Sequence, residues 1–120
     1  MRHKTIRNHI DFLVALDDAH GFVVHKDCFV LKTKSAKDSG NGKYGIVAAK
    51  KSFKLAVQRN RAKRLLRDWI AFNEDLMLPD LDYIFIARTS ILDCDREKGR
   101  KMLLQAFKEI AKLYNNNVKH

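Results

Sequence analysis

The sequence predicts a single α+β domain over residues 1–120, an α-β-β-α-β-α sandwich with helices packed on a small mixed sheet. Three observations lead to this prediction. The chain has 120 residues, 46% of them hydrophobic, which suits one core and leaves too little apolar surface for a second. Apolar residues recur at helical spacing in three segments, and they alternate or run continuously in three others. Turn-forming residues gather between these segments.

The first helix is expected over residues 5–17. Four of its apolar residues share one face, a normal core stripe: Ile6, Ile10, Leu13 and Val14. Phe12 and Leu16 point away from that stripe. They either cover a second edge of the core or stay partly exposed as a platform for something flat and apolar, such as a nucleic-acid base. The residues alone leave both interpretations open.

Two strands are expected next. Residues 22–34 favour extended chain, most securely at 28–33, where side chains alternate between two faces. The loop that follows, SAKDSGNGK, is rich in turn residues. Residues 44–50 predict the second strand, and the short link predicts that it runs antiparallel to the first.

A strongly two-faced helix is expected over residues 56–72. At about 100° per residue, one face is apolar: Ala62, Leu65, Trp69 and Phe72. The opposite face is polar, with Arg61 near its border: Arg59, Asn60, Lys63, Arg64 and Arg67. Burial of the apolar face, worth about 25 cal/mol per Å², fixes the helix. The cations are then presented outward as a rigid ridge.

The last two elements follow a break at Pro79 and Asp80. Residues 81–88 are apolar almost throughout, as expected of a strand buried on both sides. A final helix is capped by Asp93 or Asp95 and runs to about residue 114. Its core stripe comprises Leu103, Phe107, Ile110 and Tyr114.

The net charge of +10 and the isoelectric point near 9.8 indicate a polyanionic partner. Nucleic acid is the first candidate. An anionic membrane is second, but neither a lipid anchor nor a long amphipathic basic helix is evident. No apolar run approaches the 18 or so residues of a membrane span, and no signal peptide is recognised. We therefore expect a protein that stays in the cytoplasm.

Intrinsic catalysis and metal binding are not indicated. Cys28 and Cys94 show no CxxC spacing and are expected to be small buried residues, and the five histidines form no ligand pair. No hydrolase motif, P-loop or paired carboxylate motif is present. A stand-alone nuclease would need clustered carboxylates that the sequence lacks.

Binding to phosphates is better supported. Arginine pairs bidentately with phosphate, and lysine acts as a point charge. The stripe Asn60, Lys63, Arg64 and Arg67 can follow a phosphate backbone. Asn60 can bond a 2′-hydroxyl, a base edge or a loop carbonyl, or it can simply cap the helix. A general RNA-binding module, such as a ribosomal protein or RNA chaperone, shares this charge and is the alternative function.

The stretch AAKKSFKLAVQRNRAKRLLRDW, residues 48–69, resembles the signature of the protein subunit of bacterial ribonuclease P. The matching elements are the lysine pair 50–51, Ala-Val at 56–57, the Arg-Asn-Arg core at 59–61, Lys-Arg at 63–64 and the charges at 67–68. Similarity extends to Asp11-Phe12, to residues 29–31 and to residues 82–88. The loop Ser52–Leu55 departs from the family, which usually has Gly-Asn there.

The resemblance implies a fold like the second domain of ribosomal protein S5, whose strand–helix–strand unit crosses over left-handed, against the usual rule. It implies the protein component of an endoribonuclease that removes the 5′ leader from precursor tRNA. A partner RNA performs the hydrolysis with Mg²⁺, and the protein, monomeric and 1:1 with that RNA, holds no catalytic residue and no metal site.

The resemblance also implies two sets of binding residues. The set expected to contact the catalytic RNA is Lys50, Lys51, Lys54, Arg59, Asn60, Arg61, Lys63, Arg64 and Arg67. The set expected to line a leader cleft between the first helix and the sheet is Phe12, Leu16, Val30, Lys32, Val47, Ala49 and Lys51.

Overall fold

The computed structural model describes residues 4–5, 21–36, 40 and 42–118, which form strands, two long helices and two short 3₁₀ turns. In chain order these are β1 (Lys4–Thr5), β2 (Val23–His25), β3 (Phe29–Ser35), β4 (Lys43–Val47), α2 (Ala56–Phe72), η1 (Glu74–Leu76), β5 (Leu81–Ala87), η2 (Thr89–Asp93) and α3 (Arg96–Val118). The first helix expected from the sequence lies outside the described residues, apart from Thr5, which ends β1.

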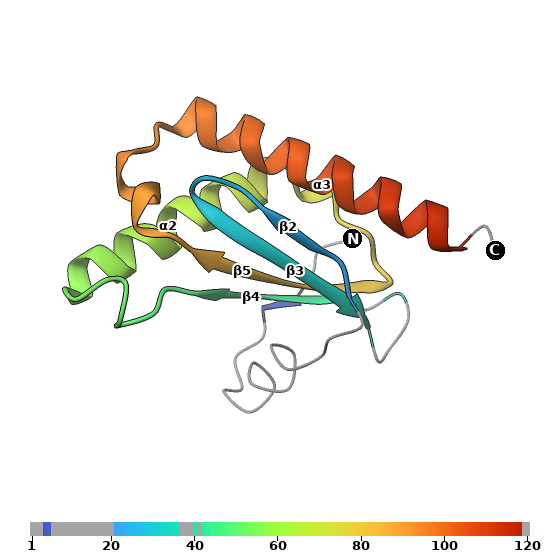
Figure 1. Cartoon of the computed structure of the whole chain (residues 1–120), viewed down its shortest axis with the longest axis horizontal. Coiled ribbons are helices and arrows are strands. Elements are labelled where there is room, and N and C mark those ends of the chain that lie inside the picture. Colours follow the sequence, from blue (N-terminus) through green and yellow to red (C-terminus); the bar gives the residue numbers. More distant parts are fainter. Residues whose placement is uncertain (1–3, 6–20, 37–39, 41, 119–120) are drawn as a thin grey trace.

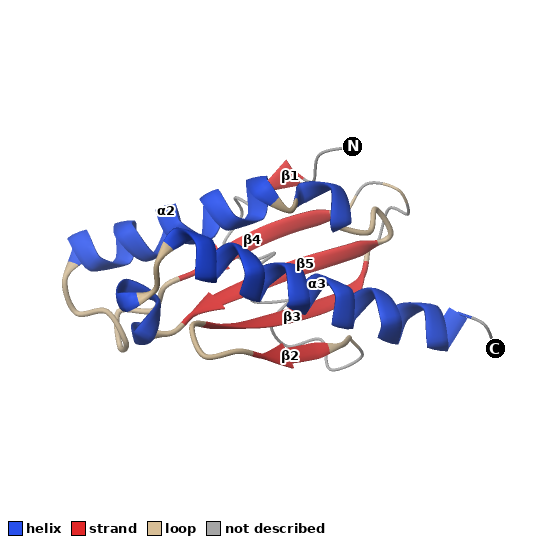
Figure 2. Ribbon diagram, turned by 90° about the horizontal axis from the view of Figure 1, so that it is seen from above, coloured by secondary structure: helices blue, strands red, loops and turns tan. Residues whose placement is uncertain are grey.

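The strands form one mixed sheet in the order β1-β4-β5-β3-β2. Strand β4 pairs in parallel with β1 and β5, whereas β3 pairs antiparallel with β5 and β2. Helices α2 and α3 lie side by side over one face of this sheet (Figure 1 and Figure 2). The predicted α+β class, with helices packed on a small mixed sheet, is therefore confirmed.

The pairing expected between the first two strands is wrong. Strand β5 lies between β3 and β4, and it pairs with β3 over seven residues, from Leu81 opposite Ser35 to Ala87 opposite Phe29. This arrangement agrees with burial: every residue of β5 except Ile86 is buried, and the central position, with a strand along each edge, suits the most buried strand. The strands β3 and β4 do run in opposite directions, but each of them pairs with β5.

The segment predicted as one extended run, residues 22–34, is two strands that form a hairpin. The chain turns between β2 and β3, where the Lys26 amide donates to the Phe29 carbonyl at 2.9 Å. Gly21 lets the end of the hairpin close, because a Cβ there would lie 1.2 Å from the Thr33 carbonyl oxygen. The amide of Thr33 in turn donates to the Phe22 carbonyl at 2.9 Å.

The crossover from β4 through α2 to β5 is left-handed. With the helices toward the viewer in Figure 2, the chain runs leftward along β4, returns rightward along α2 in front of the sheet and enters β5 on the side of β3. This agrees with the expectation from the resemblance and departs from the right-handed rule for parallel strands.

Helix α2 spans residues 56–72 as predicted, but its buried face is rotated from the expected one. Ala62, Leu66, Trp69 and Ile70 are the buried residues. Leu65 is half-buried, and Phe72 is 63% exposed. The assignment of Phe72 to the core is therefore wrong. The reason is its position in the last turn, where its ring lies against Arg100 of α3 and not in the interior.

Close approach between the two helices depends on Gly99 of α3. A Cβ at that position would lie 2.0 Å from Cζ2 of Trp69, whose side chain is fully buried. The Trp69 ring also lies 6.4 Å from the ring of Phe29 in β3. Trp69 thus joins α2, α3 and the sheet in one core.

Helix α3 begins after Asp95, whose carboxylate accepts a hydrogen bond from the Lys98 amide at 2.7 Å. Of the two predicted caps, Asp95 is therefore the one used. The helix runs to Val118, about one turn beyond the predicted end. Its expected core residues Leu103, Phe107 and Ile110 are buried, and Tyr114 is half-buried.

The two cysteines are free and pack at one end of the core. Cys28 is buried, with its Sγ 3.9 Å from the Ser90 carbonyl oxygen, and Cys94 is half-buried. Burial, followed by the influence of the neighbouring Cys28 thiol, raises the pKa of Cys94 to about 11. The expectation of a small buried residue is confirmed for Cys28 and is wrong for Cys94, which packs against the core but stays half-buried. Their proximity was not suggested by their wide separation along the chain.

Candidate nucleic-acid interface

The basic helix is held in place by a buried loop residue. The chain turns after β4, where the amides of Ser52 and Phe53 both donate to the Ala49 carbonyl. Phe53 is fully buried and anchors this turn to the core. Leu55 then precedes the helix without any side-chain cap, and the first turn of α2 holds no acidic residue. Within the described residues, neither a side-chain cap nor a carboxylate of the first turn compensates the positive end of the helix dipole.

Arg59 is the member of the predicted set that has an internal role. Its Nη1 atom donates to the Phe53 carbonyl at 2.7 Å and to the Lys54 carbonyl at 3.3 Å. These bonds tie the first turn of α2 to the preceding loop. Arg59 is half-buried, so we interpret it as a residue that orients the loop.

The cationic ridge consists of Asn60, Arg61, Lys63, Arg64 and Arg67. All are exposed except Lys63, which is half-buried. Within the described part of the chain, none of its four cations forms a salt bridge. Because the buried face of α2 is fixed by Trp69, these cations project from a rigid support and remain available to an external anion.

The loop lysines lie beside the start of this ridge. Lys50, Lys51 and Lys54 are all exposed, and they immediately precede the first turn of α2. Helix N-termini attract phosphate because free amides and the helix dipole point toward the ligand. The structure thus brings all nine residues of the predicted RNA-contacting set to α2 and the loop before it.

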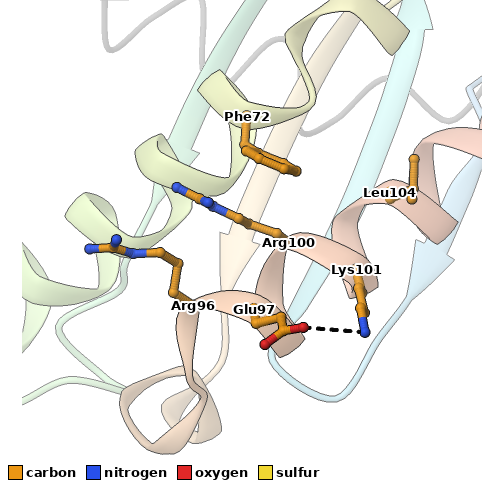
Figure 3. Close-up of a pocket in the computed structure, with 6 residues that line it drawn as sticks. All are labelled: Phe72, Arg96, Glu97, Arg100, Lys101 and Leu104. Carbon is orange, nitrogen blue, oxygen red and sulfur yellow. Dashed lines mark ion pairs between the residues drawn. The ribbon is translucent and has the colours of Figure 1, made fainter.

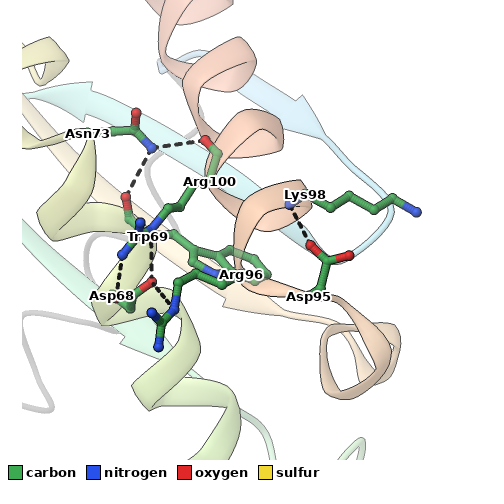
Figure 4. Close-up of polar contacts among 7 residues, drawn as sticks. All are labelled: Asp68, Trp69, Asn73, Asp95, Arg96, Lys98 and Arg100. Atoms are coloured by element: carbon green, nitrogen blue, oxygen red, sulfur yellow. Dashed lines mark hydrogen bonds and ion pairs between the residues drawn. The ribbon is translucent and has the colours of Figure 1, made fainter.

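At the C-terminal end of the ridge, an ion-pair cluster joins α2 to α3. Asp68 accepts from Nε and Nη2 of Arg100, at 3.2 and 3.1 Å, and its Oδ2 lies 4.0 Å from Nε of Arg96 (Figure 4). The buried Asn73 side chain donates to the carbonyls of Trp69 and Arg100, both at 3.0 Å. These contacts fix the end of α2 against α3.

The sheet face opposite the helices carries three of the residues that were predicted to line a leader cleft. Strand register places His25, Val30, Ile86 and Val47 in one row across β2, β3, β5 and β4. Lys32 lies in the next row, opposite Ile84. Their counterparts on the other face, Phe29 and Leu31 in β3, belong to the helix-covered core. Val30, Lys32 and Val47 therefore share one surface, and their role in a leader cleft stays a prediction.

Other predicted cleft residues are placed differently. Ala49 and Lys51 are exposed in the segment after β4, beyond the end of the strand, which stops at Val47 and not at the predicted residue 50. Phe12 and Leu16 lie outside the described residues, so their part in the cleft stays a prediction.

The structure adds residues to this face that the sequence reasoning missed. Ile86 completes the apolar row, and Nη2 of Arg88 lies 3.3 Å from Nδ1 of His25 at its end. Both His25 and Arg88 are exposed. Alternation along residues 81–88 would have placed Ile86 on this face, but the apolar run concealed it.

The described residues show no cluster that would hold a metal ion. Among them, no group of three or more His, Cys, Asp or Glu side chains lies close enough to hold a metal ion. Within the same part of the chain, no helix has both the length and the hydrophobicity needed to cross a membrane. What the site offers chemically is fixed positive charge on α2 and an apolar strand surface on the opposite face of the sheet.

Comparison with known proteins identifies the family. A family model described as Ribonuclease P matches residues 1–111. The ribonuclease P protein component of Lactobacillus delbrueckii subsp. bulgaricus is 37% identical over 101 residues, covering 84% of this chain and 82% of the relative. That of Pseudomonas putida is 32% identical over 111 residues, covering 92% and 81%.

The solved structures agree. The ribonuclease P protein of Staphylococcus aureus superposes with a TM-score of 0.70 at 26% identity, covering 94% of this chain and 96% of that one. The similarity thus spans both the basic helix and the sheet. The chain belongs to the ribonuclease P protein family, as the protein component of the bacterial enzyme that processes precursor tRNA.

Proposed function

We propose that this chain binds ribonuclease P RNA, one protein per RNA, through the cationic ridge and the loop lysines. The observation that carries the proposal is the ridge itself. Its cations are held outward by a helix whose other side is buried, and within the described residues they have no acidic partner. Such an array suits a folded polyanion, because its charges need no reorganisation to meet phosphates.

The opposite face of the sheet is the proposed surface for the 5′ leader of precursor tRNA. Val30 and Val47 supply apolar contact, and Lys32 supplies a charge for the backbone. Phe12 and Leu16 belong to this proposal as the first-helix side of the cleft, where Phe12 supplies the aromatic contact, worth about 1–3 kcal/mol per base, and Leu16 an apolar one. His25 and Arg88 extend the surface at its edge.

Hydrolysis is assigned in this proposal to the RNA, with Mg²⁺ held mainly by RNA phosphates. The composition of the basic helix supports this assignment. Its one acidic residue, Asp68, pairs with Arg100 and Arg96. The protein then raises affinity for leader and metal by neutralising phosphate charge. Since this processing follows transcription, we place the protein in the bacterial cytoplasm.

The proposal is tested by reconstitution with a bacterial ribonuclease P RNA at low Mg²⁺, following release of the leader from a precursor tRNA. We expect the protein to stimulate cleavage, and to do so less as the leader is shortened. Stimulation that is independent of leader length would contradict leader binding. Leader cleavage by the protein without the RNA would contradict RNA catalysis.

A further inference from the structure

A groove on the outer side of the helix layer is not used by the function described so far. It lies between the last turn of α2 and the first half of α3, and its volume is about 460 Å³. Six side chains line it: Phe72, Arg96, Glu97, Arg100, Lys101 and Leu104 (Figure 3). It therefore combines an apolar floor with a cationic rim.

The floor of the groove contains a prearranged flat platform. The guanidinium carbon of Arg100 lies 4.2 Å from the centroid of the Phe72 ring. Arg100 is held in that position by its two hydrogen bonds to Asp68. Phe72 is nevertheless 63% exposed, so much of its side chain remains open to a ligand. An exposed aromatic ring stacked on a guanidinium group suits a planar, electron-rich partner.

The rim of the groove offers cations to an anion. The side chains of Arg96 and Lys101 are 72% and 74% exposed. Arg96 reaches Asp68 only at 4.0 Å, and Lys101 pairs with Glu97 at 3.5 Å in an exposed i,i+4 contact. Exposed pairs of this kind contribute little, so a phosphate can replace them at small cost.

The groove is continuous with the cationic ridge. Arg64, Asp68 and Phe72 stand at i, i+4 and i+8 on α2, so they follow one stripe of the helix. The axial rise from Arg64 to Phe72 is about 12 Å. A strand that contacts Arg61 and Arg64 therefore passes directly onto the Arg96 side of the groove.

We propose that the groove between α2 and α3 binds one unstacked nucleotide of a single-stranded RNA segment that leaves the cationic ridge. The base packs against Phe72 and Arg100, and the adjoining phosphate is held by Arg96 and Lys101. This inference rests on the proposed RNA-binding role of the ridge. Single-stranded RNA is favoured because every base presents a stacking face, whereas the bases of an A-form duplex are hidden in its stack.

The test uses the full-length protein and a 12-residue oligouridylate that carries 4-thiouridine. Phe72→Leu keeps an apolar side chain and removes the aromatic face. We expect it to weaken oligouridylate binding at least about fivefold, with an unchanged salt dependence. We expect Arg96→Gln to lower the slope of log affinity against log salt by about 0.7. Irradiation should cross-link the oligouridylate to residues of α3 that line the groove.

Lys112→Gln supplies the matched control, since it removes one exposed α3 cation about 12 Å beyond Leu104. It should leave the cross-links in place and the affinity close to that of the unaltered protein. Thermal unfolding of each variant establishes that the fold is intact.

Three results would overturn the inference. In the first, Phe72→Leu binds RNA with wild-type affinity while Arg61→Ala binds more weakly. This result would contradict binding in the groove but would leave the proposed function of the ridge intact. In the second, both variants bind RNA with wild-type affinity. This result would contradict RNA binding by the groove and by the ridge. The third is a concentration-dependent dimer that Phe72→Leu abolishes while RNA affinity is unchanged, which assigns the groove to a second copy of this chain.

Discussion

The contact between Gly99 and Trp69 predicts that one added methyl group destabilises the whole domain. In Gly99→Ala, the new Cβ would lie 2.0 Å from Cζ2 and 2.1 Å from Cε2 of the indole. These are ring atoms of a side chain with no exposed surface, wedged between α2, α3 and β3. The ring cannot turn away, so the two helices must separate.

The size of the effect follows from two opposing contributions. Alanine favours a helix over glycine by about 1 kcal/mol, which stabilises the variant. Overpacking of a core typically costs about 1–3 kcal/mol, and an overlap this deep with a fixed ring belongs at the upper end. The net loss is then about 2 kcal/mol. For a domain of this size that corresponds to a fall in Tm of roughly 8 °C.

Urea and thermal unfolding of the full chain measure this loss, and Trp69→Phe makes the comparison specific. Phenylalanine lacks the indole atoms that the added methyl group would meet. The buried Nε1 of Trp69 has no hydrogen-bond partner among the described residues, so its removal breaks no bond there. We expect Gly99→Ala to cost less in the Trp69→Phe background than in the unaltered protein. Gly99→Ala that is as stable as the original chain would refute the reasoning.

The other predictions concern the two binding surfaces and one buried phenol. Arg61→Ala should weaken affinity for ribonuclease P RNA and flatten its salt dependence while the Tm is unchanged, whereas Lys112→Ala should do neither; filter binding over a salt series decides this. Lys32→Ala should lower the salt dependence of leader binding by about 0.7, and an unchanged slope would place the leader elsewhere. Burial raises the pKa of Tyr83 from 10.0 to about 12, against the effect of the Leu78 amide that donates to its oxygen at 2.8 Å. The folded state then binds the Tyr83 proton more tightly than the unfolded state does. The contribution of Tyr83 to the free energy of unfolding is therefore complete below pH 10 and is lost as the pH rises toward 12. Denaturant unfolding between about pH 9 and 12 should show this fall, and Tyr83→Phe should show a smaller one.

The sequence predicted the elements well where one physical signal dominated. The two-faced pattern gave the bounds of α2, and the apolar run 81–87 gave a buried strand. The sequence did not predict which strands are neighbours in the sheet. Periodicity indicates which residues are buried, but it does not indicate which strand pairs with which. The position of β5 between β3 and β4 depends on a non-local choice that the short β3–β4 link did not reveal.

The candidate site could be predicted in its charge but not in its bonding. Helical spacing identified the ridge, yet it could not show that Arg59 turns back to the Phe53 carbonyl. Helical spacing also assigned Phe72 to the core. This assignment failed because spacing along one helix carries no information on how far the contact between α2 and α3 extends. Arg88 and His25, 63 residues apart in sequence, became neighbours only through strand register.

The place of β5 in the sheet also bears on how the chain folds as it is synthesised. Neither β3 nor β4 has its main partner until residues 81–87 have left the ribosome, so the sheet closes late and from the middle. Until then both strands keep open edges, which other chains can join. The basic helix packs on β5, so part of the surface that supports its buried face is absent until that strand is in place.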